Sequence, residues 1–222
     1  MPLASVAPVR RPPRLDRTRA SYDQVATDYA RLLDDELDDK PLERALLSTF
    51  AELVTHGGGR RVADLGCGTG RIAAHLHSLG LDVRGTDLSP GMVAVARQRY
   101  PTLTFDVSDM RSVALSDGAV GGVVAWYSTV HTPTDGLTEV FLEVRRVLRT
   151  GGQALVAFKV GDGFVHLDHA YGHPVALDVH RHDVTVVEGL LGGSGLRVHT
   201  RVVRDPDRGE STPQAFLVAQ AA

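Results

Sequence analysis

The sequence predicts an α/β fold, a doubly wound sheet that is mostly parallel and has an antiparallel last strand. Short apolar segments alternate with helical segments along most of the 222 residues, and this alternation is typical of parallel sheets. Residues 119–126 form a continuous apolar run, as expected for a strand that is buried on both faces. Turn-forming residues at 205–209 join two strand-like segments, which indicates a hairpin and therefore an antiparallel last strand.

The N-terminal segment is expected to hold a lead-in and two helices. Residues 1–19 combine four prolines with five arginines, a composition that disfavours a helix, so we expect a disordered basic lead-in. Helices follow near 21–36 and 41–55. In the first of them Tyr22 and Tyr29 stand seven positions apart and therefore share one face, together with the apolar residues between them.

A glycine-rich turn follows the first predicted strand, 60–65. The segment Asp64-Leu-Gly-Cys-Gly-Thr-Gly70 connects this strand directly to a helix at 70–79. Glycines permit a sharp turn and let a ligand lie against the amides of a helix N-terminus, where partial positive charge collects. A turn that serves packing alone would show the same glycines, so this motif leaves both interpretations open.

An acidic residue closes the second predicted strand, 82–86. In doubly wound sheets a carboxylate at the place of Asp87 accepts hydrogen bonds from the ribose hydroxyls of a bound nucleoside. The alternative is a helix cap. The following helix, 90–99, already has Ser89 as its cap and Pro90 as its first residue, so Asp87 is not needed for that role.

The third predicted strand, 103–106, is also followed by an acidic residue, Asp109. The next residue, Met110, is an apolar side chain suited to packing on an adenine ring. Because ligands of open α/β sheets bind at the carboxyl ends of the strands, we expect Asp64, Asp87 and Asp109 to converge on one crevice.

With these motifs the chain resembles the class I S-adenosylmethionine-dependent methyltransferases, of the bacterial type that modifies small molecules. Four motifs in the order of that family carry the likeness: Asp64-Leu-Gly-Cys-Gly-Thr-Gly70, Gly85-Thr-Asp87-Leu-Ser-Pro-Gly-Met92, Asp109-Met110 and Val147-Leu-Arg-Thr-Gly-Gly152. The resemblance extends over residues 20–220 and implies a Rossmann-like methyltransferase fold with a seven-stranded sheet. It also implies S-adenosylmethionine as cofactor and S-adenosylhomocysteine as product, but it does not name the methyl acceptor.

The resemblance further implies which residues bind the cofactor. They come from the first helix, the glycine turn and the ends of the following strands: Tyr22, Tyr29, Asp64, Gly66, Cys67, Gly68, Gly70, Asp87, Leu88, Met92, Asp109, Met110 and Trp126. In similar proteins the helix that carries the tyrosines closes over the cofactor, and one tyrosine reaches its aminoacyl end. Cys67, between two glycines, is expected to be a small packing residue rather than a catalytic thiol.

The remaining elements complete a single domain, which we expect over residues 20–222. Within it, 20–56 is expected to form a helical cap and 161–182 an inserted lid. The elements still to be placed are strand 119–126, helix 135–149, strand 152–160, helix 183–193 and the strand pair 196–204 and 213–220.

Composition limits the class of partner. A net charge of −3 gives no general reason to expect nucleic acid or an anionic membrane, so a small-molecule acceptor is left by elimination. We find no apolar run long enough to span a bilayer and no apolar core of a secretory signal. The single cysteine suits a reducing compartment, and we expect a cytoplasmic protein. The oligomeric state does not follow from the sequence.

A hydroxyl acceptor would need a base to remove its proton, and histidine is the simplest one near neutral pH. His131 is the first candidate because it follows strand 119–126 at the edge where the crevice is expected. In the resembling family this loop flanks the methionine part of the cofactor. His131 is therefore either the base or a residue that shapes the pocket.

Five of the ten histidines lie within the segment 161–182. Long structureless insertions in compact domains are usually functional or disordered, and we interpret this one as a substrate lid. His166 and His169 are further candidates for the base, although exposed histidines in a lid need no special role. The pattern His166-x-Asp168 has the composition of part of a facial iron triad, but a glycine-flanked loop lacks the required rigid scaffold, so we expect no metal.

The expected function is O-methylation of a small molecule. N-methylation and a non-catalytic S-adenosylmethionine-binding role are the alternatives. A nicotinamide-dependent oxidoreductase is a more distant alternative, because its fingerprint is G-x-G-x-x-G and here Gly70 comes one residue early.

Overall fold

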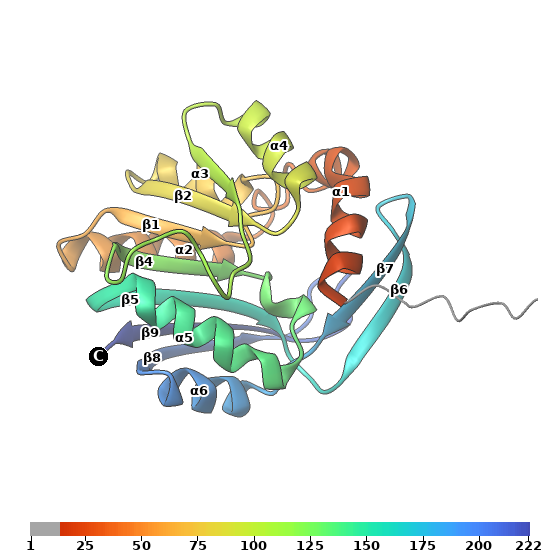
Figure 1. Ribbon diagram of the computed structural model, residues 1–222. Helices are drawn as coiled ribbons and strands as arrows, with labels where there is room; N and C mark the ends of the chain where they lie inside the picture. The colour runs from red at the N-terminus through yellow and green to blue at the C-terminus, as the bar shows by residue number, and fades with distance from the viewer. Residues whose placement is uncertain (1–13) are drawn as a thin grey trace, which may run out of the picture.

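The computed structural model describes residues 14–222 and shows one seven-stranded sheet with helices on both faces (Figure 1). The strands of this sheet are Arg61–Leu65 (β1), Asp82–Asp87 (β2), Thr104–Val107 (β3), Val120–Trp126 (β4), Leu148–Lys159 (β5), Leu196–Arg204 (β8) and Gln214–Ala221 (β9). The helices are Arg14–Leu32 (α1), Pro41–His56 (α2), Arg71–Ser78 (α3), Pro90–Arg99 (α4), Leu137–Val147 (α5) and Val184–Gly193 (α6).

The strand order is β3-β2-β1-β4-β5-β9-β8. Strands β1 to β5 pair in parallel, whereas β9 runs antiparallel to both of its neighbours. The predicted fold class and the antiparallel last strand are therefore confirmed. The order of connection reverses at β1 and β4, and this reversal opens a crevice at the carboxyl ends of the strands.

The core lies on both faces of the central strand β4, all of whose residues are buried. One apolar cluster includes Phe141 of α5, and the other includes Phe50 of α2. Each such fully buried side chain contributes roughly 1.5–3 kcal/mol. A Cβ at Gly122 would lie 2.7 Å from the Val54 side chain, so glycine is needed in β4 for α2 to pack this closely.

Local sequence signals fix several helix starts as expected. Ser89 Oγ accepts a hydrogen bond from the Met92 amide at 3.0 Å, which caps α4 as predicted. Asp183 caps α6 in the same way, through the amide of Val186. Helix α5 is shorter than predicted, because a 3-10 turn at Thr134–Gly136 precedes it and β5 already begins at Leu148.

The disorder predicted for residues 1–19 does not extend over all of them. Residues 14–19 belong to α1, so the expectation of disorder is wrong for them, and the rest of the predicted lead-in lies outside the described residues. The cap predicted for 20–56 does not include most of α2. Helix α2 instead packs against the sheet beneath β4 and β5 (Figure 1).

The segment 161–182 is not structureless, which corrects that part of the prediction. It forms an antiparallel hairpin of Phe164–Ala170 (β6) and His173–His180 (β7), which lies beside α1 (Figure 1). Val165 pairs with Val179 and Leu167 with Leu177, so apolar side chains gather on one face of the hairpin. This alternation was present in the sequence, but the many histidines and glycines obscured it.

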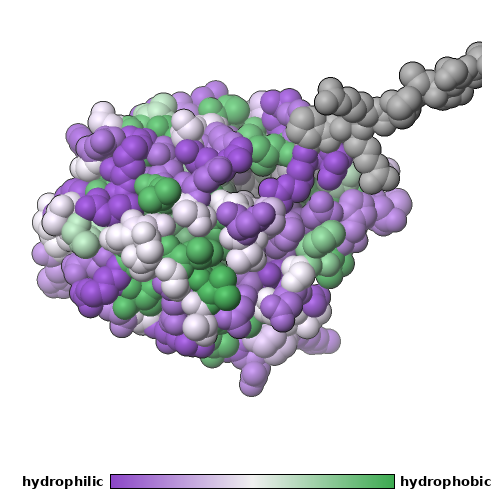
Figure 2. Space-filling model, turned by 60° about the horizontal axis from the view of Figure 1, so that its bottom comes forward, coloured by the Kyte–Doolittle hydropathy of each residue, from purple (hydrophilic) through white to green (hydrophobic). Residues whose placement is uncertain are grey.

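The surface mixes hydrophobic and hydrophilic residues, as the space-filling view shows for one face (Figure 2). Exposed apolar side chains include Leu142 of α5 and Val186 of α6. Within residues 14–222, we find no helix of the length and apolar character that crossing a membrane requires.

Candidate active site

A cavity of about 590 Å³ lies at the carboxyl ends of the parallel strands, beneath α1 and the hairpin. This volume falls in the range of about 300–1,000 Å³ that is usual for ligand pockets. Its lining brings together these sequence-predicted residues: Tyr22, Tyr29, Gly66, Gly68, Asp87, Leu88, Met92, Asp109, Met110, Trp126 and His131.

The glycine turn forms one wall of the cavity. Its glycines let the backbone pass close to the neighbouring loop, and two of its amides already have hydrogen-bond partners within the protein. A Cβ at Gly66, which has φ +73°, would lie 2.3 Å from the Cβ of Ser128, so only glycine fits between these two loops. The Gly68 amide donates to Asp87 at 2.8 Å, and the Gly70 amide donates to the Cys67 carbonyl at 3.0 Å. The expectation that these two amides face the ligand is therefore corrected.

Asp87 is the carboxylate around which this wall is organised. Its Oδ2 accepts the Gly68 amide and its Oδ1 accepts the Ser89 amide at 2.9 Å. Burial raises the pKa of Asp87, and the amides of Ser89 and Gly68 counter this rise. Each carboxylate oxygen has two lone-pair sites, so Asp87 can still accept hydrogen bonds from ribose hydroxyls.

Three of the predicted cofactor residues do not line the cavity: Asp64, Cys67 and Gly70. Asp64 is buried behind the turn, and neither of its carboxylate oxygens has a well-formed hydrogen bond within residues 14–222. Burial and the neighbouring Asp87 raise the pKa of Asp64 to about 7, against the opposing effects of Arg71 and the Ala73 amide. Burial also raises the pKa of the Cys67 thiol, as suits the predicted packing residue.

At the β3 side of the cavity Asp109 is held by an arginine that the sequence reading did not single out. Arg111 donates to the Asp109 carboxylate at 2.6 Å, and this hydrogen bond lowers the pKa of Asp109. Leu88 and Met110 supply apolar lining beside it. An acid next to two apolar side chains suits a heterocyclic base with an amino group.

The two predicted tyrosines of α1 line the roof of the cavity. The ring of Tyr29 lies 4.9 Å from that of Tyr171 in the hairpin turn, and both rings belong to a small cluster with Met92 of α4. Burial raises the pKa of Tyr22 and of Tyr29, so both hydroxyls stay protonated. These tyrosines therefore have both a packing and a lining role.

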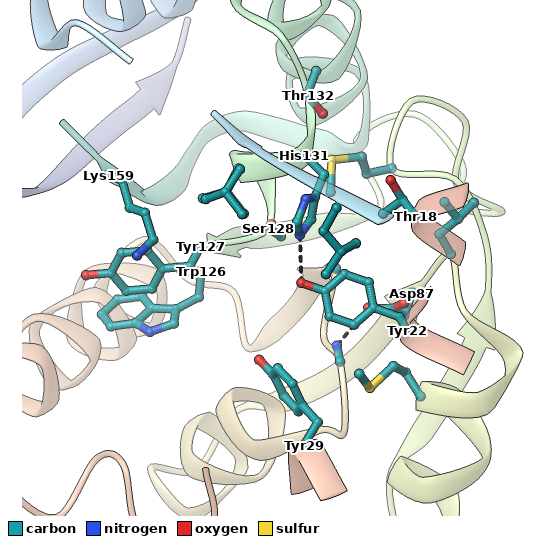
Figure 3. A pocket seen from close by; sticks show the side chains of 18 of the residues that line it. Thr18, Tyr22, Tyr29, Asp87, Trp126, Tyr127, Ser128, His131, Thr132 and Lys159 are labelled. Carbon is teal, nitrogen blue, oxygen red and sulfur yellow. Dashed lines mark hydrogen bonds between the residues drawn. The ribbon is translucent and has the colours of Figure 1, made fainter. Parts of the chain in front are cut away.

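His131 lies in the 3-10 turn after β4 and makes two hydrogen bonds that define its tautomer. Its Nδ1 is 2.9 Å from the carbonyl oxygen of Asp178, which can only accept, so Nδ1 carries the proton. Its Nε2 lies 2.6 Å from the hydroxyl oxygen of Tyr22 and accepts a hydrogen bond from that hydroxyl (Figure 3). Burial lowers the pKa of His131, which favours the neutral ring.

His166 and His169 lie away from the cavity. The His166 side chain is 53% exposed and bonds to the Asp178 carboxylate at 2.6 Å, on the hairpin face opposite the apolar pairs. The His169 side chain is 75% exposed. Neither residue lines the cavity, so their position lends no support to the prediction that they are catalytic.

Sequence reasoning missed several residues that complete the site. Tyr127 follows β4 with φ +52°, a backbone conformation that costs about 1–3 kcal/mol in a non-glycine residue and often marks functional sites. The buried hydroxyl of Ser128 has no hydrogen-bond partner among residues 14–222. Lys159, at the end of β5, lies beside Tyr127 and Trp126 (Figure 3). The position of each at a strand end was the available signal.

These residues fit S-adenosylmethionine. Gly66 leaves room where a Cβ would clash, Asp87 can hold the ribose, and Met110 can pack on the adenine. The aromatic rings of Tyr22, Tyr29 and Trp126 surround the space in which a sulfonium would be favoured by their electron-rich faces. Within the described chain, no group of three or more His, Cys, Asp or Glu residues is placed to hold a metal ion.

Comparison with known proteins agrees with this geometry. The sequence model of a family described as a methyltransferase domain matches residues 62–152. The demethylmenaquinone methyltransferase of Beutenbergia cavernae is 34% identical over 150 residues, which cover 63% of this chain and 61% of that protein. The malonyl-[acyl-carrier protein] O-methyltransferase of Serratia marcescens is 32% identical over 113 residues, 51% of this chain and 44% of that protein. The chain thus spans about three fifths or less of the length of these curated relatives.

Solved structures show the same fold over nearly the whole chain. Magnesium protoporphyrin IX methyltransferase from Synechocystis, determined with bound S-adenosylmethionine, superposes with a TM-score of 0.71 and 15% identity. The superposition covers 95% of this chain and 98% of that one. Residues 62–152 thus match a methyltransferase domain, and the chain as described has the fold of the class I S-adenosylmethionine-dependent methyltransferases.

Proposed function

We propose that this protein transfers a methyl group from S-adenosylmethionine to a hydroxyl group of a small-molecule acceptor. The matched methyltransferase domain supports the methyl donor, and the names of the relatives above give demethylmenaquinone and malonyl-[acyl-carrier protein] as their targets. The observation that carries the choice of a hydroxyl acceptor is the hydrogen-bonded series Tyr22, His131 and the Asp178 carbonyl at the cavity wall.

The bound cofactor supplies a methyl group on a sulfonium sulfur, which is a good leaving group. The protein must then hold the acceptor in line with that methyl group and remove the acceptor proton. Positioning alone can supply about 7–11 kcal/mol of the barrier. The position of the site beneath α1 and the hairpin suits this role, because these two covers limit the access of bulk water to the cavity.

His131 is ready to take the proton through Tyr22. Because Nδ1–H donates to the Asp178 carbonyl, the lone pair of Nε2 points at the Tyr22 hydroxyl. In the proposed step the acceptor hydroxyl passes its proton to the Tyr22 oxygen while Tyr22 passes its own to Nε2. The acceptor oxygen bonds to the methyl carbon as the carbon–sulfur bond breaks, and the resulting imidazolium of His131 later releases its proton to water.

The test is a screen of small hydroxyl and amine compounds with methyl-labelled donor, read as a mass shift of the product. We expect labelled ethers, and a loss of about 10²–10⁴-fold in kcat for His131→Ala, the usual share of general base catalysis. His169→Ala is the matched control, since its side chain is exposed and outside the cavity. Labelled amines alone, with full activity in His131→Ala, would favour N-methylation instead. Cofactor binding without any turnover would favour the non-catalytic role.

A further inference from the structure

Two cations that line the cavity have no anionic partner. Neither the Lys159 ammonium nor the Arg181 guanidinium makes an ion pair or a side-chain hydrogen bond within residues 14–222. Both residues are only partly exposed. Charged groups that are partly removed from water are usually paired, so two neighbouring unpaired cations call for a ligand.

The backbone holds these two residues side by side. Val160 of the β5 end and His182 after β7 form a parallel bridge, and the His182 amide donates to the Lys159 carbonyl at 2.9 Å. Val160 packs against the core and His182 is buried, so the preceding residues, Lys159 and Arg181, face the other way, toward the cavity. The stem of Arg181 lies over Gly161, where a Cβ would meet it at 3.2 Å.

The carboxylates that line the cavity are not available to these cations, because each already has partners. Glu36 pairs with Arg71, while Glu43 and Glu210 pair with Arg204. At the other side Arg111 holds Asp109, and backbone amides hold Asp87. Lys159 and Arg181 are therefore left as an excess of positive charge on the β5 side.

The walls next to these cations are apolar and aromatic. Val165, Leu167, Leu177 and Val179 of the hairpin line the cavity, and Figure 3 shows Lys159 above the rings of Tyr127 and Trp126. In the strand order β4 separates β5 from β1 and β2, so Lys159 lies on the far side of β4 from Asp87. The cations thus face the space for the acceptor rather than the nucleoside.

We propose that Lys159 and Arg181 bind a carboxylate on the methyl acceptor. The acceptor is then a small, largely apolar or aromatic acid that also carries the hydroxyl to be methylated. An arginine offers paired donors in the geometry of a carboxylate, and a lysine adds a point charge beside it. The inference that the two cations bind an anionic group does not depend on the proposed function. The statement that this group belongs to the methyl acceptor does depend on it.

The test uses a matched pair of fluorescent probes, 8-anilinonaphthalene-1-sulfonate and its neutral parent 1-anilinonaphthalene, titrated into the protein saturated with S-adenosylhomocysteine. We expect Lys159→Gln and Arg181→Gln each to weaken binding of the sulfonate by about 10-fold or more, the usual effect of losing a charge-assisted hydrogen bond. Binding of the neutral parent should change by less than about twofold. Lys159→Arg should keep the affinity for the sulfonate.

Arg61→Gln is the control, because its side chain is 76% exposed at the opposite end of the sheet. Equal weakening of both probes, or none, would overturn the inference. So would a wild-type protein that does not prefer the sulfonate. Calorimetry with S-adenosylhomocysteine separates the remaining cases. A loss of its affinity in both variants would mean that the cations hold the cofactor carboxylate. No binding by wild type would overturn the proposed function, and the two probes would then be titrated into the protein without S-adenosylhomocysteine to test the cation site alone.

Discussion

His173 of the hairpin and Asp28 of α1 lie with Nε2 and Oδ2 2.8 Å apart, which joins the two elements that cover the cavity. Beside this contact the rings of Tyr171 and Tyr29 meet at 4.9 Å, and the Ala176 amide donates to Ser21 at 3.0 Å. The two covers are thus held together by contacts that lie outside the sheet, and ion pairing of Arg17 with Asp178 adds to them. An acceptor can enter if these contacts separate without disturbing the sheet.

His173→Ala should loosen the hairpin. The two side chains are about one third exposed, so the pair is screened by water and its loss should cost less than about 1 kcal/mol. We expect hydrogen exchange of the β7 amides to become up to about fivefold faster, with no change in the central strands. Exchange measured by mass spectrometry checks this, with His169→Ala as control. If hydrogen exchange became equally faster in β4, the contact between His173 and Asp28 would not act on the hairpin alone, which would contradict this prediction.

Asp87→Ala should weaken cofactor binding. The substitution removes the carboxylate that we expect to bind the ribose and also releases the Gly68 amide, so we expect a loss of about 1.5–3 kcal/mol in the binding of S-adenosylmethionine. Isothermal calorimetry gives the affinity directly. Asp106→Ala serves as the comparison, because Asp106 lies in the adjacent strand β3 and outside the cavity lining. Similar losses in both variants would point to a folding defect.

Tyr22→Phe should reduce kcat while leaving the affinity for S-adenosylhomocysteine within about threefold. The phenyl ring keeps the packing but cannot relay a proton to His131, whose Nε2 now accepts from Tyr22. Unchanged kcat with a measured acceptor would refute the relay.

The pH profile of kcat tests the state of His131. Burial lowers its pKa, so the neutral, proton-accepting form persists below the ordinary histidine value of 6.5. We expect kcat to stay level from neutral pH down past 6.5 and to fall only under more acidic conditions, as His131 becomes protonated. A fall centred above 6.5 would assign the acid limb to another group.

Asp64→Asn should stabilise the protein at alkaline pH. The pKa of Asp64 is raised from 3.8 to about 7 in the folded state, so its contribution is fully favourable below 3.8 and is lost as pH rises through 7. Above that pH the native state holds an unpaired buried charge, which asparagine removes. We expect asparagine to raise the free energy of unfolding by about 2 kcal/mol more at pH 8 than at pH 5, because pH 5 lies between the two pKa values and only part of the penalty acts there. An equal change in the free energy of unfolding at both pH values would show that ionisation of Asp64 is not the cause.

The nucleoside half of the site could be predicted because its residues are close in sequence to strand ends. Glycine spacing and the acid of β2 are local signals, and the structure places Gly66 and Asp87 on the cavity wall as they indicate. The hydrogen-bond partner of the Gly68 amide could not be predicted, because this partner, Asp87, lies 19 positions away in the sequence. The partner of His131 is 109 positions away, and only tertiary packing brings it there.

The acceptor half was harder to predict for a related reason. Lys159 and Arg181 carry no motif, and their pairing depends on one bridge between the ends of β5 and β7. The histidines that stood out most in the sequence, His166 and His169, turned out to be exposed. Residue type drew attention to the outer face of the hairpin, whereas the alternation of apolar residues identifies the inner one.

The matched methyltransferase domain, 62–152, contains neither α1 nor the hairpin, although both cover the cavity. Part of the cavity lining therefore comes from stretches of chain that lie outside the matched domain. The hairpin is joined to the sheet through the ends of residues 161–182, and its Tyr171 ring and Asp178 carbonyl contact Tyr29 and His131 at the cavity wall. An exchange of this segment between relatives would therefore have to keep these two contacts.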